Sequence, residues 1–68
     1  MFTVCALYQF VRLDDFESFR EPLRELMVEL EIKGTILLAL EGLNGTVSGT
    51  QNSIDKLIEF LDKDGRFD

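Results

Sequence analysis

Glu41 and Asn44 are the side chains whose setting most suggests a functional contact. They lie in the glycine-rich stretch 41–49, where glycine allows another backbone to approach closely. Proton-transfer chemistry needs a well-placed acid or base partner, and Glu41 has none evident in the sequence. We therefore interpret both residues as turn residues or as contacts with another domain or an RNA. We assign no catalytic, cofactor-binding or metal-binding residue, and no cofactor.

Arg12 and Lys33 are two further candidates for contacts with another domain or an RNA. Arg12 precedes Asp14 and Asp15, and we expect it to pair with one of them on the surface. Lys33 is either such a contact or a solvated cation near a helix C-terminus, where it would favour the helix dipole. The single cysteine, Cys5, lies among apolar neighbours, whereas a reactive thiolate needs electropositive surroundings, so we predict a packing role for it.

Composition limits the class of protein. The chain has 68 residues, 46% of them apolar, which is enough for the core of one domain and no more. Its net charge of −6 would repel RNA or DNA over most of its surface. No apolar run reaches the roughly 18 residues of a membrane span, and no basic region opens a signal peptide. With a lone thiol that fits a reducing compartment, these features predict a soluble cytoplasmic domain without membrane contact.

The first expected element is a strand over residues 2–11. Alternate positions are largely apolar on both of its sides, which indicates a strand covered on two faces. We expect core packing rather than base stacking for the aromatic residues, because few cations surround them. These residues are Phe2, Tyr8, Phe10, Phe16 and Phe19. On the second sheet face, Leu7 and one side of the run 36–40 should lie under a partner surface.

A helix follows, although its start is ambiguous. Asp14 or Asp15 could cap it, with Glu17 as the capping-box partner of Asp14. Pro22 is tolerated only in a first turn, so the helix either begins near residues 21–22 or has distorted first turns. It should end near Glu31.

A hairpin and a second helix complete the pattern. Residues 35–40 form an apolar run of strand length, and 46–48 form the returning strand. Gly42 and the pair Asn44-Gly45 can adopt the positive φ angles that hairpin turns need. Thr50 should cap a helix that ends at Gly65, with Phe67 folding back onto the core. The expected buried stripe of this helix is Ile54, Leu57, Ile58 and Leu61.

The order β-α-β-β-α predicts an α+β, ferredoxin-like sandwich, with an antiparallel sheet and two helices on one face. The usual version adds a fourth strand beside the first, and that strand is expected to be missing from residues 1–68. The first strand would then be a sheet edge with unpaired backbone groups. We therefore expect a single domain that is a fragment of a longer protein, or one that receives a strand from a partner.

Several segments resemble the N-terminal, acylphosphatase-like domain of the bacterial rhodanese-related tRNA uridine hydroxylases. The matching segments are 6–11 with Leu13, 19–23, 32–39, 41–49 and 64–67. Glu31 occupies a place where the family often has glycine. The helix therefore either ends differently here, or Glu31 is left-handed at a cost of roughly 1 kcal/mol. Gly65 occupies a place where the family often has proline.

The resemblance implies a longer oxidoreductase whose downstream rhodanese domain carries the catalytic cysteine and converts the wobble uridine of tRNA to 5-hydroxyuridine. The present chain would be its accessory N-terminal domain, non-catalytic alone, which braces the rhodanese domain or positions the tRNA. The alternative is an interaction module that dimerises through its edge strand. Acylphosphatase activity is not predicted, because the loop 11–15 has one arginine, no glycine and two carboxylates that repel an anion.

Overall fold

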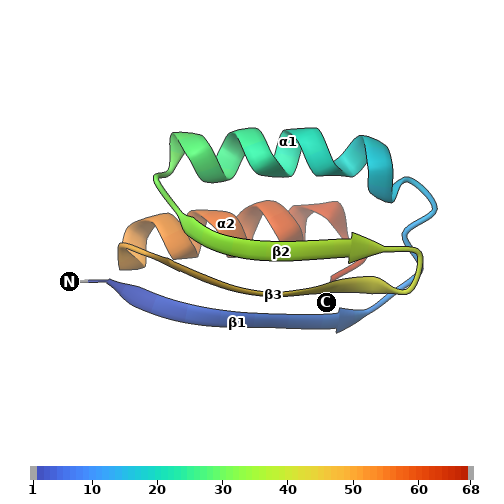
Figure 1. The fold of residues 1–68 in the computed structure, drawn as a ribbon, viewed down its shortest axis with the longest axis horizontal. Helices are drawn as coiled ribbons and strands as arrows, with labels where there is room; N and C mark the ends of the chain where they lie inside the picture. The colour runs from blue at the N-terminus through green and yellow to red at the C-terminus, as the bar shows by residue number, and fades with distance from the viewer. Residues whose placement is uncertain (1, 68) are drawn as a thin grey trace.

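The computed structural model describes residues 2–67 and contains the predicted order of elements. These are β1 (Thr3–Phe10), α1 (Phe16–Glu29), β2 (Lys33–Ala39), β3 (Gly42–Gly49) and α2 (Gln51–Asp64). The strands form one antiparallel sheet in the order β1-β3-β2, and both helices cover the same face of it (Figure 1). The predicted α+β sandwich is confirmed, and β1 is an edge strand as expected.

The core lies between the helices and the inner face of the sheet. Its ten buried members are Leu13, Phe19, Leu23, Ile32, Leu43, Val47, Ile54, Leu57, Leu61 and Phe67. Cys5 packs against this cluster from β1, which confirms its predicted packing role. Phe67 is 5% exposed and so folds back as predicted.

The two faces of β1 differ from the prediction. Among residues 2–67 only one face of the sheet is covered, and Leu7 packs on that covered side rather than on the second face. Phe2, Tyr8 and Phe10 were expected in the core, but they are 73%, 62% and 76% exposed. Both sides of β1 are apolar, so alternation alone could not identify the covered side.

Helix α1 begins before Pro22, so the first of the two predicted starts is wrong. The capping-box prediction is also wrong. Asp15 is the N-cap residue, and its side chain makes no capping hydrogen bond.

The helix ends in a Schellman motif. The Ile32 N–H donates to the Met27 carbonyl at 2.8 Å, and the Glu31 N–H donates to the Val28 carbonyl at 3.1 Å. Glu31 has φ +57°, which confirms the left-handed alternative.

The hairpin turn lies earlier than predicted. Ala39 pairs with Gly42, so the loop is Leu40-Glu41, and Gly42 has the expected positive φ, at +138°. Asn44 and Gly45 lie within β3, paired with Leu37 and Ile36, and are not turn residues. Gly45 is required there for space, because a Cβ atom would meet the Thr35 carbonyl oxygen at 2.2 Å.

Helix α2 agrees with its prediction in most details. The Thr50 hydroxyl accepts a hydrogen bond from the Ser53 N–H at 3.1 Å, and Gly65 ends the helix in a left-handed conformation. Ile58 is the exception in the buried stripe, because it is 38% exposed. The Ser53 hydroxyl donates to the Leu30 carbonyl at 2.8 Å and so ties α2 to the end of α1.

Candidate functional site

The face of the sheet opposite the helices, here called the open face, combines apolar edges with a polar middle. The register places Asn44 of β3 between Tyr8 of β1 and Leu37 of β2, and it places Thr46 between Ala6 and Thr35. Leu37 lies on this face and is 64% exposed. This agrees with the prediction that one side of the run 36–40 belongs to a second apolar face of the sheet. Exposed apolar side chains gathered on one sheet face are typical of an interaction surface.

The open face also differs from the rest of the molecule in charge. No residue of the three strands is Asp or Glu, and Lys33 is the only charged residue in them. In residues 2–67 the carboxylates belong to the helices and the connecting segments. An apolar partner surface can therefore cover the strands without burying a carboxylate.

A hollow of about 300 Å³, here called the slot, lies at one end of the open face. Tyr8 and Phe10 form one wall, with ring centroids 5.0 Å apart in an edge-to-face arrangement. Leu37 forms the other wall, about 10 Å away across two strand spacings. Gln9, Glu41 and Asn44 are the polar residues of its lining, and Tyr8 adds a hydroxyl group.

The structure brings together three of the four candidate contact residues. Glu41 and Asn44 both line the slot, and Arg12 borders a neighbouring hollow that Glu41 also lines. Lys33 lies at the end of β2 opposite the slot and pairs with Ser48. Along the strand it is about 20 Å from Ala39, which lines the slot. Lys33 is thus a separate feature of the same sheet.

The loop after β1 contains one cation, Arg12, and this cation is already paired within the loop. The Arg12 Nε donates to Asp14 Oδ1 at 2.8 Å, which confirms the predicted surface pairing, and this bond raises the pKa of Arg12. Leu13 is fully buried, and its N–H donates to the Leu40 carbonyl at 2.9 Å. A phosphate-gripping loop needs free N–H groups and a free arginine, so this arrangement does not suit acyl phosphate chemistry.

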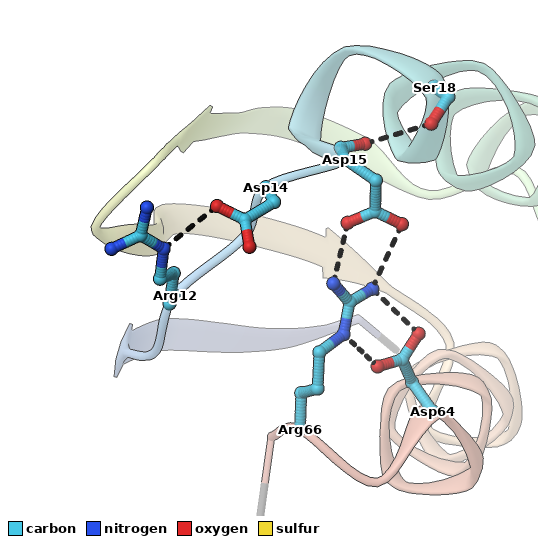
Figure 2. A network of polar contacts seen from close by, with 6 residues as sticks. All are labelled: Arg12, Asp14, Asp15, Ser18, Asp64 and Arg66. Carbon is cyan, nitrogen blue, oxygen red and sulfur yellow. Dashed lines mark hydrogen bonds and ion pairs between the residues drawn. The ribbon is translucent and has the colours of Figure 1, made fainter.

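A second polar network lies where the end of α2 meets the start of α1, and the sequence analysis missed its central residue (Figure 2). Arg66 bonds both oxygens of Asp64 and both oxygens of Asp15. Its guanidinium carbon also lies 5.5 Å from the Phe19 ring centroid. The hydrogen bonds from Arg66 hold the pKa of Asp15 and of Asp64 below the ordinary value of 3.8.

Arg66 is a structural residue, because its partners come from the protein itself. The segment 64–67 resembled the family, which was the only signal that could have pointed to it. Asp15 is 51 residues away in sequence, so no local pattern reveals the pairing.

Two further properties concern only residues 2–67. In that range no three His, Cys, Asp or Glu side chains are grouped so that they could hold a metal ion. None of its helices has both the length and the apolar character needed to cross a bilayer.

The β-α-β-β-α sandwich with an antiparallel sheet is consistent with an acylphosphatase-like, ferredoxin-type domain. The comparison with known families makes the assignment specific: residues 2–68 match the model of the UPF0176 acylphosphatase-like domain. The chain belongs to this family.

Proposed function

We propose that this chain is the accessory N-terminal domain of a longer, bacterial, cytoplasmic rhodanese-related tRNA uridine hydroxylase. In this proposal the downstream rhodanese domain makes 5-hydroxyuridine at the wobble position, and the present domain braces it. The observation that carries the proposal is the open face of a domain of this family. That face has exposed apolar side chains and no carboxylate in its strands.

The contact is proposed to be with protein rather than with tRNA. A surface that binds RNA tightly needs several cations to displace counterions, and the strands contribute only Lys33. Exposed Phe10, Tyr8 and Leu37 instead provide apolar side chains that a protein interface can bury. The tRNA would then be held mainly by the rest of the longer protein.

The test uses the full-length protein with one acidic substitution in the open face, Leu37→Asp. A buried carboxylate without a partner would weaken docking, so 5-hydroxyuridine in the tRNA should fall at least about tenfold, as measured by mass spectrometry of nucleosides. Val28→Asp is the matched control, because Val28 is 69% exposed on α1 and lies outside the open face. Equal hydroxylation by the two variants would contradict the proposal.

Self-association through the β1 edge is a second candidate function. The Val11 N–H donates to the Glu41 carbonyl at 3.1 Å in register with the β1–β3 ladder. Since hydrogen-bonding directions alternate along a strand, the N–H groups of even-numbered residues such as Ala6 point to the free edge. Residues 2–11 contain no charge, proline or glycine, which are the usual protections of an edge.

Light scattering tests this second candidate. If the edge pairs with a second copy, the 68-residue chain is a dimer, and Ala6→Pro makes it monomeric by removing an edge donor without touching the β3 ladder. A chain that stays monomeric at a concentration of about 1 mM contradicts self-association. Its dimer would then have a Kd above about 1 mM, which corresponds to a binding free energy weaker than about −4.1 kcal/mol.

A further inference from the structure

The slot has a composition that selects among ligands. Its walls are formed by the apolar groups of Phe10, Leu37 and Tyr8. Each of these residues is more than 60% exposed to solvent. Among its polar lining residues, Glu41 and Asn44 can both accept hydrogen bonds, and Glu41 is the only charged one. The slot is therefore suited to a group with an apolar body and a cationic, donor-rich end.

The carboxylate of Glu41 is free to serve such a ligand. Among residues 2–67 no ion pair involves Glu41. The cation that borders the adjoining hollow, Arg12, is bonded to Asp14 instead. A cationic ligand would therefore form a new ion pair without displacing an existing one.

The aromatic wall adds a second attraction for a cation. Tyr8 and Phe10 have an interplanar angle of 87°, so the pair presents ring faces in two perpendicular directions. A guanidinium group within about 6 Å of a ring centroid gains a cation–π interaction, and its planar shape stacks better than an ammonium group. The three methylenes of an arginine side chain could meanwhile pack on Leu37.

We propose that the slot binds an arginine side chain presented by an otherwise apolar protein segment. This inference rests on the proposed function only in assigning that segment to the rhodanese domain. A nucleobase could also stack on Tyr8 and Phe10, but its phosphate would face Glu41 and a domain of net charge −6. The arginine and the nucleotide are therefore opposite outcomes of one experiment.

The chain contains its own reporter for this experiment. Tyr8 is its only tyrosine and there is no tryptophan, so tyrosine fluorescence and the tyrosine ring NMR signals report on the slot alone. The probe is N-acetyl-arginine-N-methylamide, titrated into the isolated 68-residue chain. We expect saturable changes at Tyr8 with a Kd on the order of 1–10 mM, as suits a ligand of this size.

Matched probes and variants separate charge from shape. The citrulline analogue, which has the same shape without the charge, should bind about five- to tenfold more weakly. Glu41→Gln should weaken arginine binding by a similar factor, whereas Glu25→Gln, the same change on the exposed side of α1, should leave it unchanged. An NMR spectrum of each variant shows that it is folded.

Three outcomes overturn the proposal: equal binding of arginine and citrulline, no effect of Glu41→Gln, or Tyr8 signals that respond to uridine monophosphate and not to arginine. Because the titration contains no rhodanese domain and no tRNA, its failure leaves the hydroxylation test of Leu37→Asp unaffected. Conversely, equal hydroxylation by Leu37→Asp and Val28→Asp would leave the arginine titration valid.

Discussion

Arg66 and Asp15 lie 51 residues apart in sequence and form a two-point ion pair that joins the C-terminal end of α2 to the N-cap of α1 (Figure 2). Asp64 binds the other side of the same guanidinium group, which thus uses three nitrogens on two carboxylates. The Arg66 side chain is 30% exposed and rests near the Phe19 and Phe67 rings. The network therefore links both helices at the edge of the core.

Arg66→Gln should lower the melting temperature. The substitution removes two bidentate ion pairs and the contact with the Phe19 ring, so we expect a decrease of about 4–8 °C by circular dichroism. Arg12→Gln is the matched control, because its Asp14 pair is local and the Arg12 side chain is 80% exposed. We expect it to change the melting temperature by less than about 2 °C. Equal decreases in melting temperature for the two variants would mean that the Arg66 network stabilises the fold no more than a local surface ion pair does.

The stability advantage of wild type over Arg66→Gln should decrease in acid. The pKa values of Asp15 and Asp64 in the folded protein lie below 3.8, the value that applies to the unfolded chain. As the pH falls below about 5, the unfolded chain thus binds more protons than the folded protein does. The stabilisation by the two ion pairs is therefore lost progressively below that pH. It is fully present at pH 7. The measurement is the difference in melting temperature between the two proteins from pH 7 to pH 2, and a constant difference would contradict the assigned pairs.

Glu31→Gly should stabilise the protein by about 0.5–1 kcal/mol. Glu31 has φ +57°, a left-handed conformation that costs a residue with a Cβ roughly 1–2 kcal/mol, part of which is offset by the greater freedom of glycine when unfolded. The control is Glu25→Gly inside α1, which should destabilise by about 1 kcal/mol. Urea unfolding measures both. A loss of stability in Glu31→Gly would show that the glutamate makes a contact that outweighs its strain.

Gly45→Ala should destabilise the sheet by about 2–3 kcal/mol, because the new methyl group would meet the Thr35 carbonyl oxygen. Gly65→Ala is the comparison. Its methyl group would meet nothing within 4 Å, although φ is +86°, so we expect a cost of about 1 kcal/mol. Urea unfolding of both variants shows which substitution lowers the free energy of unfolding more. If Gly65→Ala were the more damaging variant, backbone conformation and not strand spacing would dominate.

The elements with local signals were the ones that the sequence could predict. Helix α2 has a capping threonine, a periodic apolar stripe and a left-handed glycine within one continuous segment, so Thr50 and Gly65 both mark its observed ends. The end of α1 near Glu31 followed from apolar residues at helical spacing that stop at Leu30, and its left-handed conformation was one of the two alternatives that the family resemblance raised. The open edge of β1 followed from the order of elements alone.

The errors arose where tertiary contacts decide. Asn44-Gly45 has the composition of a hairpin turn, yet Gly45 is needed because β2 approaches closely at Thr35. The apolar residues on both sides of β1 gave no indication of which side the helices would cover, so Leu7 and Phe10 were assigned to the wrong faces. Of the candidate contacts, Glu41 and Asn44 could be found from their glycine-rich setting, but the aromatic wall of the slot could not.

We propose the open face as the surface through which this domain docks. The most direct test is NMR mapping with the isotopically labelled 68-residue chain and the unlabelled rhodanese domain that we propose follows it. We expect shifts concentrated at Tyr8, Phe10, Leu37 and Asn44, all on the open face. Shifts concentrated on α1 and α2, or no shifts at all, would contradict it.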